Sequence, residues 1–89
     1  MFKILVIDDD PTLRLVLKKT IQNQGYEAIL ASNGAEGITQ AQHHHPALII
    51  CDWMMQEIDG IEVCRRLKAE PELSTTFFIL LTARKEVED

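Results

Sequence analysis

Three features are missing from this 89-residue sequence: a long apolar run, a cysteine framework and an excess of positive charge. The longest apolar runs, at 48–51 and 77–81, are far shorter than the roughly 20 residues that a membrane-spanning helix needs. We therefore expect no signal peptide and no membrane anchor. The net charge of −5 argues against direct nucleic-acid binding, because such surfaces cluster Lys and Arg.

The two cysteines do not form the spacing pattern of a disulfide scaffold. Cys51 lies in an apolar run and Cys64 at an apolar position of a predicted helix, which indicates buried, reduced thiols. Reduced thiols favour a cytoplasmic location. A redox pair is the less favoured alternative.

Apolar segments and helical repeats alternate along the chain. Segments rich in Ile, Leu, Val and Phe predict strands over residues 2–7, 26–31, 47–51 and 77–81. Helical patterns fill the intervals between them, and no internal repeat or linker divides the chain. Strands that alternate with helices at this spacing predict right-handed βαβ units and a parallel sheet, so the expected class is a single α/β domain.

The helical segments carry start and stop signals. Asp10 before Pro11 is the arrangement of an N-cap and a first helical residue, and Asn33 stands at capping-box distance from Glu36. Pro46 ends the second helix. The apolar positions expected to face the core are Leu13, Val16, Leu17 and Ile21 in the first helix, Ile38 and Ala41 in the second, and Ile61, Cys64 and Leu67 in the third.

Polar residues follow three of the predicted strands where each one ends. Asp8 and Asp9 follow the first, Asp52 follows the third and Thr82 follows the fourth. Ligands bind at the carboxyl ends of parallel strands, so we expect these side chains to converge. Two carboxylates about 4 Å apart repel by roughly 4 kcal/mol at an effective dielectric constant of about 20, which favours recruitment of a cation. All-oxygen ligands favour Mg²⁺, Mn²⁺ or Ca²⁺ over zinc.

Asp52 is the expected nucleophile of this cluster, because a carboxylate can form an aspartyl phosphate. A bound metal would orient the donor and neutralise developing charge. The Thr82 hydroxyl would then donate a hydrogen bond to a phosphoryl oxygen. The added charge, about −1.5 to −2, would favour movement of Thr82 inward and so bias a two-state surface.

Four motifs resemble those of the bacterial two-component receiver domains. Residues 4–9 read ILVIDD, residues 48–52 read LIICD, Asp59 and Gly60 head the next helix, and residues 80–83 read LLTA. The resemblance covers nearly the whole chain. It implies a flavodoxin-like parallel sheet of strand order 2-1-3-4-5 with helices on both faces.

The resemblance also implies roles for individual residues. Asp52 would be the phosphoacceptor, Asp9 a direct Mg²⁺ ligand, Asp8 an acidic partner acting through water, and Met54 a ligand through its backbone carbonyl. Thr82 would be the switch hydroxyl. The expected protein accepts a phosphoryl group from a histidine kinase or a phosphotransfer protein and switches a partner-binding surface. It is not an enzyme beyond self-phosphorylation and self-dephosphorylation.

The sequence departs from the receiver pattern in two places. Gln56 replaces a usual proline, which predicts a more flexible loop. Receivers continue with a fourth helix, a fifth strand and a fifth helix, and neither Arg84 nor Lys85 matches their phosphoryl-pairing lysine. We therefore expect residues 1–89 to form a receiver domain that lacks the fifth strand and fifth helix, so that 77–81 becomes an exposed sheet edge. Such an edge favours a homodimer or a swapped oligomer, or else indicates a fragment of something longer.

Two other functions remain open at this point. One is a phospho-independent interaction module whose switch is disabled. The other is a haloacid-dehalogenase-like phosphatase, because residues 7–12 read IDDDPT, with Asp8 as nucleophile and Asp10 as acid and base. The adjacent residues His43, His44 and His45 are interpreted as a solvated helix end, since consecutive helical side chains point in different directions.

The residues after Asp52 also allow two interpretations. Met54, Met55 and Ile58 form either a docking surface or, as we favour, the packing of a loop against the third helix. Trp53 either gates the site or docks a partner, or it is an amphipathic loop residue that partly covers the crevice.

Overall fold

The computed structural model describes residues 2–81, over which strands and helices alternate as predicted. The predicted role of Thr82 lies outside these described residues, and so do Arg84 and Lys85. The short 3₁₀ helix η1 (Pro71–Leu73) has no signal in the sequence. The elements are β1 (Lys3–Ile7), α1 (Pro11–Asn23), β2 (Glu27–Ala31), α2 (Gly34–His44), β3 (Leu48–Asp52), α3 (Gly60–Lys68), η1 (Pro71–Leu73) and β4 (Phe77–Leu81).

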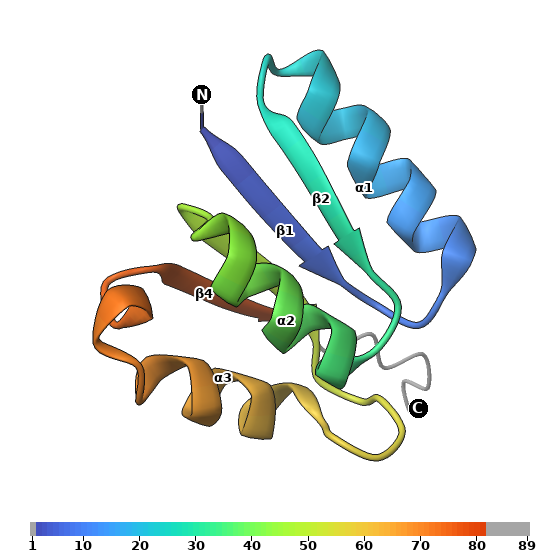
Figure 1. Cartoon of the computed structure of the whole chain (residues 1–89). Helices are drawn as coiled ribbons and strands as arrows, with labels where there is room; N and C mark the ends of the chain where they lie inside the picture. Colours follow the sequence, from blue (N-terminus) through green and yellow to red (C-terminus); the bar gives the residue numbers. More distant parts are fainter. Residues whose placement is uncertain (1, 82–89) are drawn as a thin grey trace.

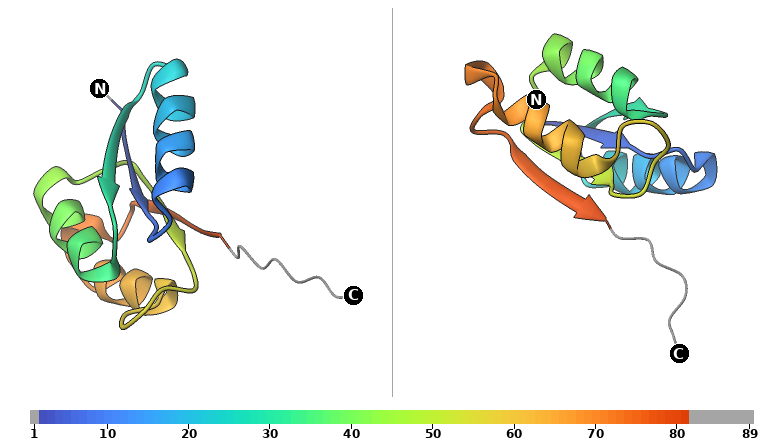
Figure 2. Two further views of the ribbon diagram at one scale, coloured as in Figure 1. Left: turned by 90° about the vertical axis from the view of Figure 1, so that its right-hand side faces the viewer. Right: turned by 90° about the horizontal axis from the view of Figure 1, so that it is seen from below.

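The strands form one parallel sheet in the order β2-β1-β3-β4. Helix α1 lies on one face of this sheet, and α2 and α3 lie on the other (Figures 1 and 2). This arrangement confirms the predicted α/β class and the first four strands of the flavodoxin-like order. No helix within residues 2–81 is both long enough and apolar enough to cross a bilayer.

The core has two parts, one on each face of the sheet. Leu5, Ile7 and Ile49 are fully buried on the α2 and α3 face, whereas Ile4 and Val6 pack with α1 on the other. Burial of one Leu or Ile side chain stabilises the fold by about 1.5–3 kcal/mol. Because β1 is buried on both faces, it forms a rigid support for the acidic residues that follow it.

Two predicted helix faces are partly wrong. In α3, Ile61 is 48% exposed and Val63 is fully buried, since the buried stripe runs through Gly60, Val63 and Leu67. Cys64 is only half-buried. In α1, Val16 is 52% exposed, because this helix packs over β1 and β2.

Strand β4 lies at the edge of the sheet, as predicted. Phe78 and Leu80 pack against the core on the α2 and α3 face. Phe77 and Ile79 point to the opposite face and are 75% and 46% exposed. Within residues 2–81, no strand pairs with the outer side of β4. The predicted apolar edge is therefore present.

Candidate metal and phosphoryl site

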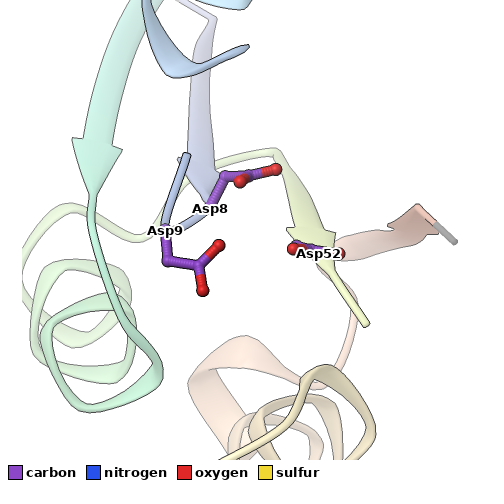
Figure 3. Close-up of side chains that lie close together, drawn as sticks. All are labelled: Asp8, Asp9 and Asp52. Atoms are coloured by element: carbon purple, nitrogen blue, oxygen red, sulfur yellow. The ribbon is translucent and has the colours of Figure 1, made fainter. Parts of the chain in front are cut away.

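Three carboxylates converge where β1 and β3 end (Figure 3). Asp8 and Asp9 directly follow β1, and Asp52 is the last residue of β3. The sequence predicts that this strand ends at Cys51, so the observed strand ends one residue later. One oxygen from each carboxylate lies within 4.8 Å of the others. Asp8 and Asp52 are buried, at 2% and 7% exposure, whereas Asp9 is exposed.

The turn from β1 into α1 holds Asp8 in place. The Asp10 carboxylate caps α1 by accepting a 3.0 Å hydrogen bond from the Thr12 N–H. The Asp10 N–H donates to Asp8 Oδ1 at 2.8 Å, and Arg14 Nη1 donates to the Asp8 carbonyl oxygen at 2.7 Å. Asp10 thus behaves as a solvated helix cap, but the buried Asp8 does not.

The loop after β3 holds Asp52 from the other side. The Met54 N–H donates to Asp52 Oδ1 at 3.3 Å, and the Trp53 N–H donates to the Leu81 carbonyl at 3.0 Å. Met55 and Ile58 pack against the core, as the packing interpretation predicts. That interpretation is wrong for Met54, whose side chain is 66% exposed.

Burial raises the pKa of both Asp8 and Asp52, and the negative charges of neighbouring aspartates raise it further. The hydrogen bonds from the Asp10 and Met54 N–H groups act in the opposite direction and lower the pKa of Asp8 and Asp52 respectively. The site therefore concentrates negative charge that a cation would relieve.

One oxygen of the site has no hydrogen-bond partner among the described residues. Asp8 Oδ2 is buried and unpartnered, although a buried polar atom without a partner costs about 1–3 kcal/mol. It belongs to the carboxylate nearest the end of β1, beside Asp9 and Asp52. An all-oxygen cluster with an unpartnered buried oxygen fits a hard divalent cation such as Mg²⁺.

The Cys51 thiol lies next to the site, and its surroundings disfavour the reactive thiolate form. Burial, together with the charges of Asp52 and Asp8, raises its pKa to about 12. Both Cys51 and Cys64 are free thiols. The prediction of a buried thiol therefore holds for Cys51 and is wrong for Cys64.

Trp53 lies at the rim of the site, where it is 40% exposed. It lines a groove together with Asp9, Met54 and Asp59. Because Trp53 is the single tryptophan of the sequence, its fluorescence is a direct optical probe of this groove.

The three histidines do not join a metal site within the described residues. His45 ends α2 in the left-handed conformation, with φ 49°, and its ring nitrogen lies 2.9 Å from Glu72 Oε1. His43 and His44 pack ring against ring with centroids 4.7 Å apart. In residues 2–81 the acidic cluster alone brings together three possible metal ligands of the His, Cys, Asp and Glu types. This supports the interpretation of the three histidines as a helix end.

Two residues near the site have no predicted role in it from the sequence. Arg14 contacts the Asp8 carbonyl, and Gly60 allows α3 to approach β3. A Cβ atom on Gly60 would lie 2.6 Å from the Asp52 carbonyl oxygen. The motif places Gly60 at the start of α3, but only the tertiary structure shows this close approach.

The profile of the response regulator receiver domain family matches residues 4–89. The chain is 38% identical over 84 residues to the phosphate regulon transcriptional regulatory protein PhoB of Rhizobium meliloti, covering 94% of this chain and 37% of that protein. It is 37% identical to the alkaline phosphatase synthesis transcriptional regulatory protein PhoP of Bacillus subtilis, covering 94% of this chain and 34% of that protein.

The fold is also that of solved receiver structures. The chemotaxis protein CheY4 of Vibrio cholerae superposes with a TM-score of 0.90 at 29% identity, covering 97% of this chain and 72% of that one. This chain therefore belongs to the response regulator receiver domain family. It spans about a third of the length of the two curated relatives.

Proposed function

We propose that residues 1–89 form a receiver domain that accepts a phosphoryl group on Asp52 from a histidine kinase or a phosphotransfer protein. An Asp52 carboxylate oxygen attacks phosphorus, the P–N bond of the phosphohistidine breaks, and the imidazole leaves with the electron pair and takes up a proton. The product is an aspartyl phosphate. The chain accepts the group and does not turn over a separate substrate.

Mg²⁺ is the proposed cofactor, and the observation that carries this proposal is the convergence of three carboxylates around the unpartnered Asp8 Oδ2. Asp9, Asp52 and the Met54 backbone carbonyl would hold the ion directly, with Asp8 acting through water. When bound, the ion would neutralise charge on the transferring phosphoryl group. Asp8 and Asp52 are buried at the ends of β1 and β3. The protein would therefore hold these two carboxylates in place before the ion binds.

The proposed output is a change of partner surface. Thr82 directly follows β4 in the sequence, and we propose that its hydroxyl donates to a phosphoryl oxygen after transfer. The two curated relatives are named as transcriptional regulators. For this acidic segment we propose a signalling role in the cytoplasm without direct contact to nucleic acid or membrane.

A second copy of this chain is the partner we propose for the edge of β4. The strand reads FFILL, with no charge and no proline to block pairing. Phe77 and Leu81 already bond to the β3 side, so the N–H and C=O groups of Phe78 and Leu80 point to the outer edge. Antiparallel pairing across a two-fold axis at Ile79 would satisfy those groups. It would also place the two acidic sites at opposite ends.

Transfer from a phosphorylated histidine phosphotransfer protein tests the proposed donor. Wild type, Asp52→Asn and Asp59→Asn would be incubated with the labelled donor and Mg²⁺. Asp59 is the matched control, since it is an acidic residue of the neighbouring groove and caps α3. Label on wild type and Asp59→Asn, but not on Asp52→Asn, is expected. Label on Asp52→Asn would contradict the assignment.

The phosphatase interpretation is wrong. The family match is to receivers, and Asp10, its proposed acid and base, is engaged as the N-cap of α1.

A further inference from the structure

We propose that Arg14 is a positioning residue for the metal site, because its guanidinium fixes the peptide group that joins Asp8 to Asp9. This inference rests on the metal-binding function proposed above. Arg14 lies near the start of α1 and is half-buried. Its Nη1 donates a 2.7 Å hydrogen bond to the carbonyl oxygen of Asp8, and that carbonyl belongs to the peptide group between the two acids.

Other hydrogen bonds fix the amide N–H and one carboxylate oxygen of Asp8. Its N–H donates to the Ala31 carbonyl at 3.1 Å, and its Oδ1 accepts from the Asp10 N–H at 2.8 Å. The carbonyl oxygen is therefore the group of Asp8 that depends on Arg14. The Asp9 carboxylate makes no hydrogen bond within residues 2–81, so the backbone on either side of Asp9 sets the direction in which its side chain leaves the chain. A rotation of the Asp8 carbonyl would therefore redirect the Asp9 side chain.

Arg14 could affect metal binding through its charge or through its positioning of the ligands. These two effects change the Mg²⁺ affinity in opposite directions. A positive guanidinium near a cation site lowers the affinity for Mg²⁺ by repulsion. A residue that orients the ligands raises that affinity, and loss of such outer contacts typically weakens metal binding about 10–100-fold. Removal of Arg14 should therefore tighten Mg²⁺ binding if charge dominates and weaken it if positioning dominates.

Arginine suits the end of β1 because its planar donors keep a fixed geometry that a lysine ammonium does not reproduce.

Calorimetric titration with Mg²⁺ tests the proposal on the full 89-residue chain. Lys18→Gln is the matched control: Lys18 is on the same helix, is half-buried and loses the same charge, but its side chain makes no hydrogen bond within the described residues. We expect Arg14→Gln to weaken binding about tenfold or more, Lys18→Gln to leave it unchanged or slightly tighter, and Arg14→Lys to fall between. Arg14→Gln that binds as tightly as Lys18→Gln would overturn the proposal.

Hydrogen exchange of the Asp10 amide without metal gives a second readout, followed by NMR. This N–H is held by Asp8 Oδ1, so we expect faster exchange in Arg14→Gln and Arg14→Lys than in wild type and Lys18→Gln. Absence of Mg²⁺ binding by wild type would refute the metal proposal. The exchange rate of the Asp10 amide would still show whether Arg14 holds the turn around Asp8. Equal Asp10 exchange in all four folded chains would refute that role.

Discussion

Gly60 packs directly against Asp52: a Cβ atom on Gly60 would lie 2.6 Å from the Asp52 carbonyl oxygen. Since the obstacle is backbone, a side chain at this position requires α3 or the end of β3 to move. The Gly60 N–H also donates to the Trp53 carbonyl at 2.9 Å. The position of α3 and the position of the candidate phosphoacceptor are therefore coupled.

Gly60→Ala should disturb both stability and the site. Overpacking of this kind typically costs about 1–3 kcal/mol of unfolding free energy, measured by urea denaturation. We also expect weaker Mg²⁺ binding, measured by Trp53 fluorescence. Gly25→Ala is the control, because Gly25 has φ 88° and no atom near its Cβ position, so alanine there costs about 1–2 kcal/mol through backbone strain alone. Equal Mg²⁺ affinity in both variants would refute the coupling.

Removal of the Asp52 charge should stabilise the metal-free chain at pH 7. Burial and neighbouring charges raise the pKa of Asp52 above 3.8, so the folded state binds its proton more tightly than the unfolded state. Unfolding free energy then falls as pH rises from the unfolded pKa through the folded pKa. Above that window the ionised Asp52 destabilises the fold, so Asp52→Asn should be more stable than wild type.

Glu62 is a control for this experiment, because its pKa is shifted in the opposite direction from that of Asp52. Hydrogen bonds from Arg65 and Arg66 lower the pKa of Glu62, so its ionised form stabilises the fold and Glu62→Gln should not gain stability at pH 7. Urea denaturation at pH 7 and at pH 4 measures both variants. The advantage of Asp52→Asn should shrink at the lower pH. An advantage that grows there would contradict the assigned direction.

Cys64 should react with thiol reagents long before Cys51. Cys51 is fully buried with a pKa of about 12, whereas Cys64 is half-buried. At pH 8 only about one Cys51 in 10⁴ would be a thiolate, the reactive form. Iodoacetamide labelling followed by peptide mass spectrometry measures both sites, with the urea-unfolded chain as control. Faster labelling of Cys51 in the folded chain would contradict this account.

Ile79→Lys should abolish self-association through β4. Ile79 is 46% exposed on the edge strand, at the centre of the proposed two-fold pairing, where two lysines would repel. Val16→Lys is the matched control, since Val16 is 52% exposed on α1, away from that edge. Sedimentation velocity over a concentration series should show a dimer for wild type and Val16→Lys only. A monomeric wild type would refute the proposed pairing.

Local signals account for most of the fold. Asp10 and Pro11 predict the start of α1, and the apolar run before Asp8 predicts a strand buried on both faces. The failures are positions whose burial depends on neighbouring elements. Val16 has the spacing of a core residue, yet it is exposed, because α1 packs mainly over β1 and β2.

The three carboxylates of the candidate site are predictable from the sequence, whereas the residues that support them are less so. Asp8, Asp9 and Asp52 follow from the rule that parallel strands end at one edge. Arg14 does not, because its partner is a backbone carbonyl rather than a charged side chain, and no residue pattern marks such a contact. Gly60 likewise has a sequence signal for a helix start but none for its contact with Asp52.

The measurement that tests phosphoryl acceptance most directly is intact mass after incubation with acetyl phosphate. Wild type and Asp52→Asn would be compared with and without Mg²⁺, each shown to be folded by circular dichroism. We predict one phosphoryl adduct on wild type that requires Mg²⁺ and is absent from Asp52→Asn. The absence of an adduct on folded wild type would contradict the account and favour a phospho-independent interaction module.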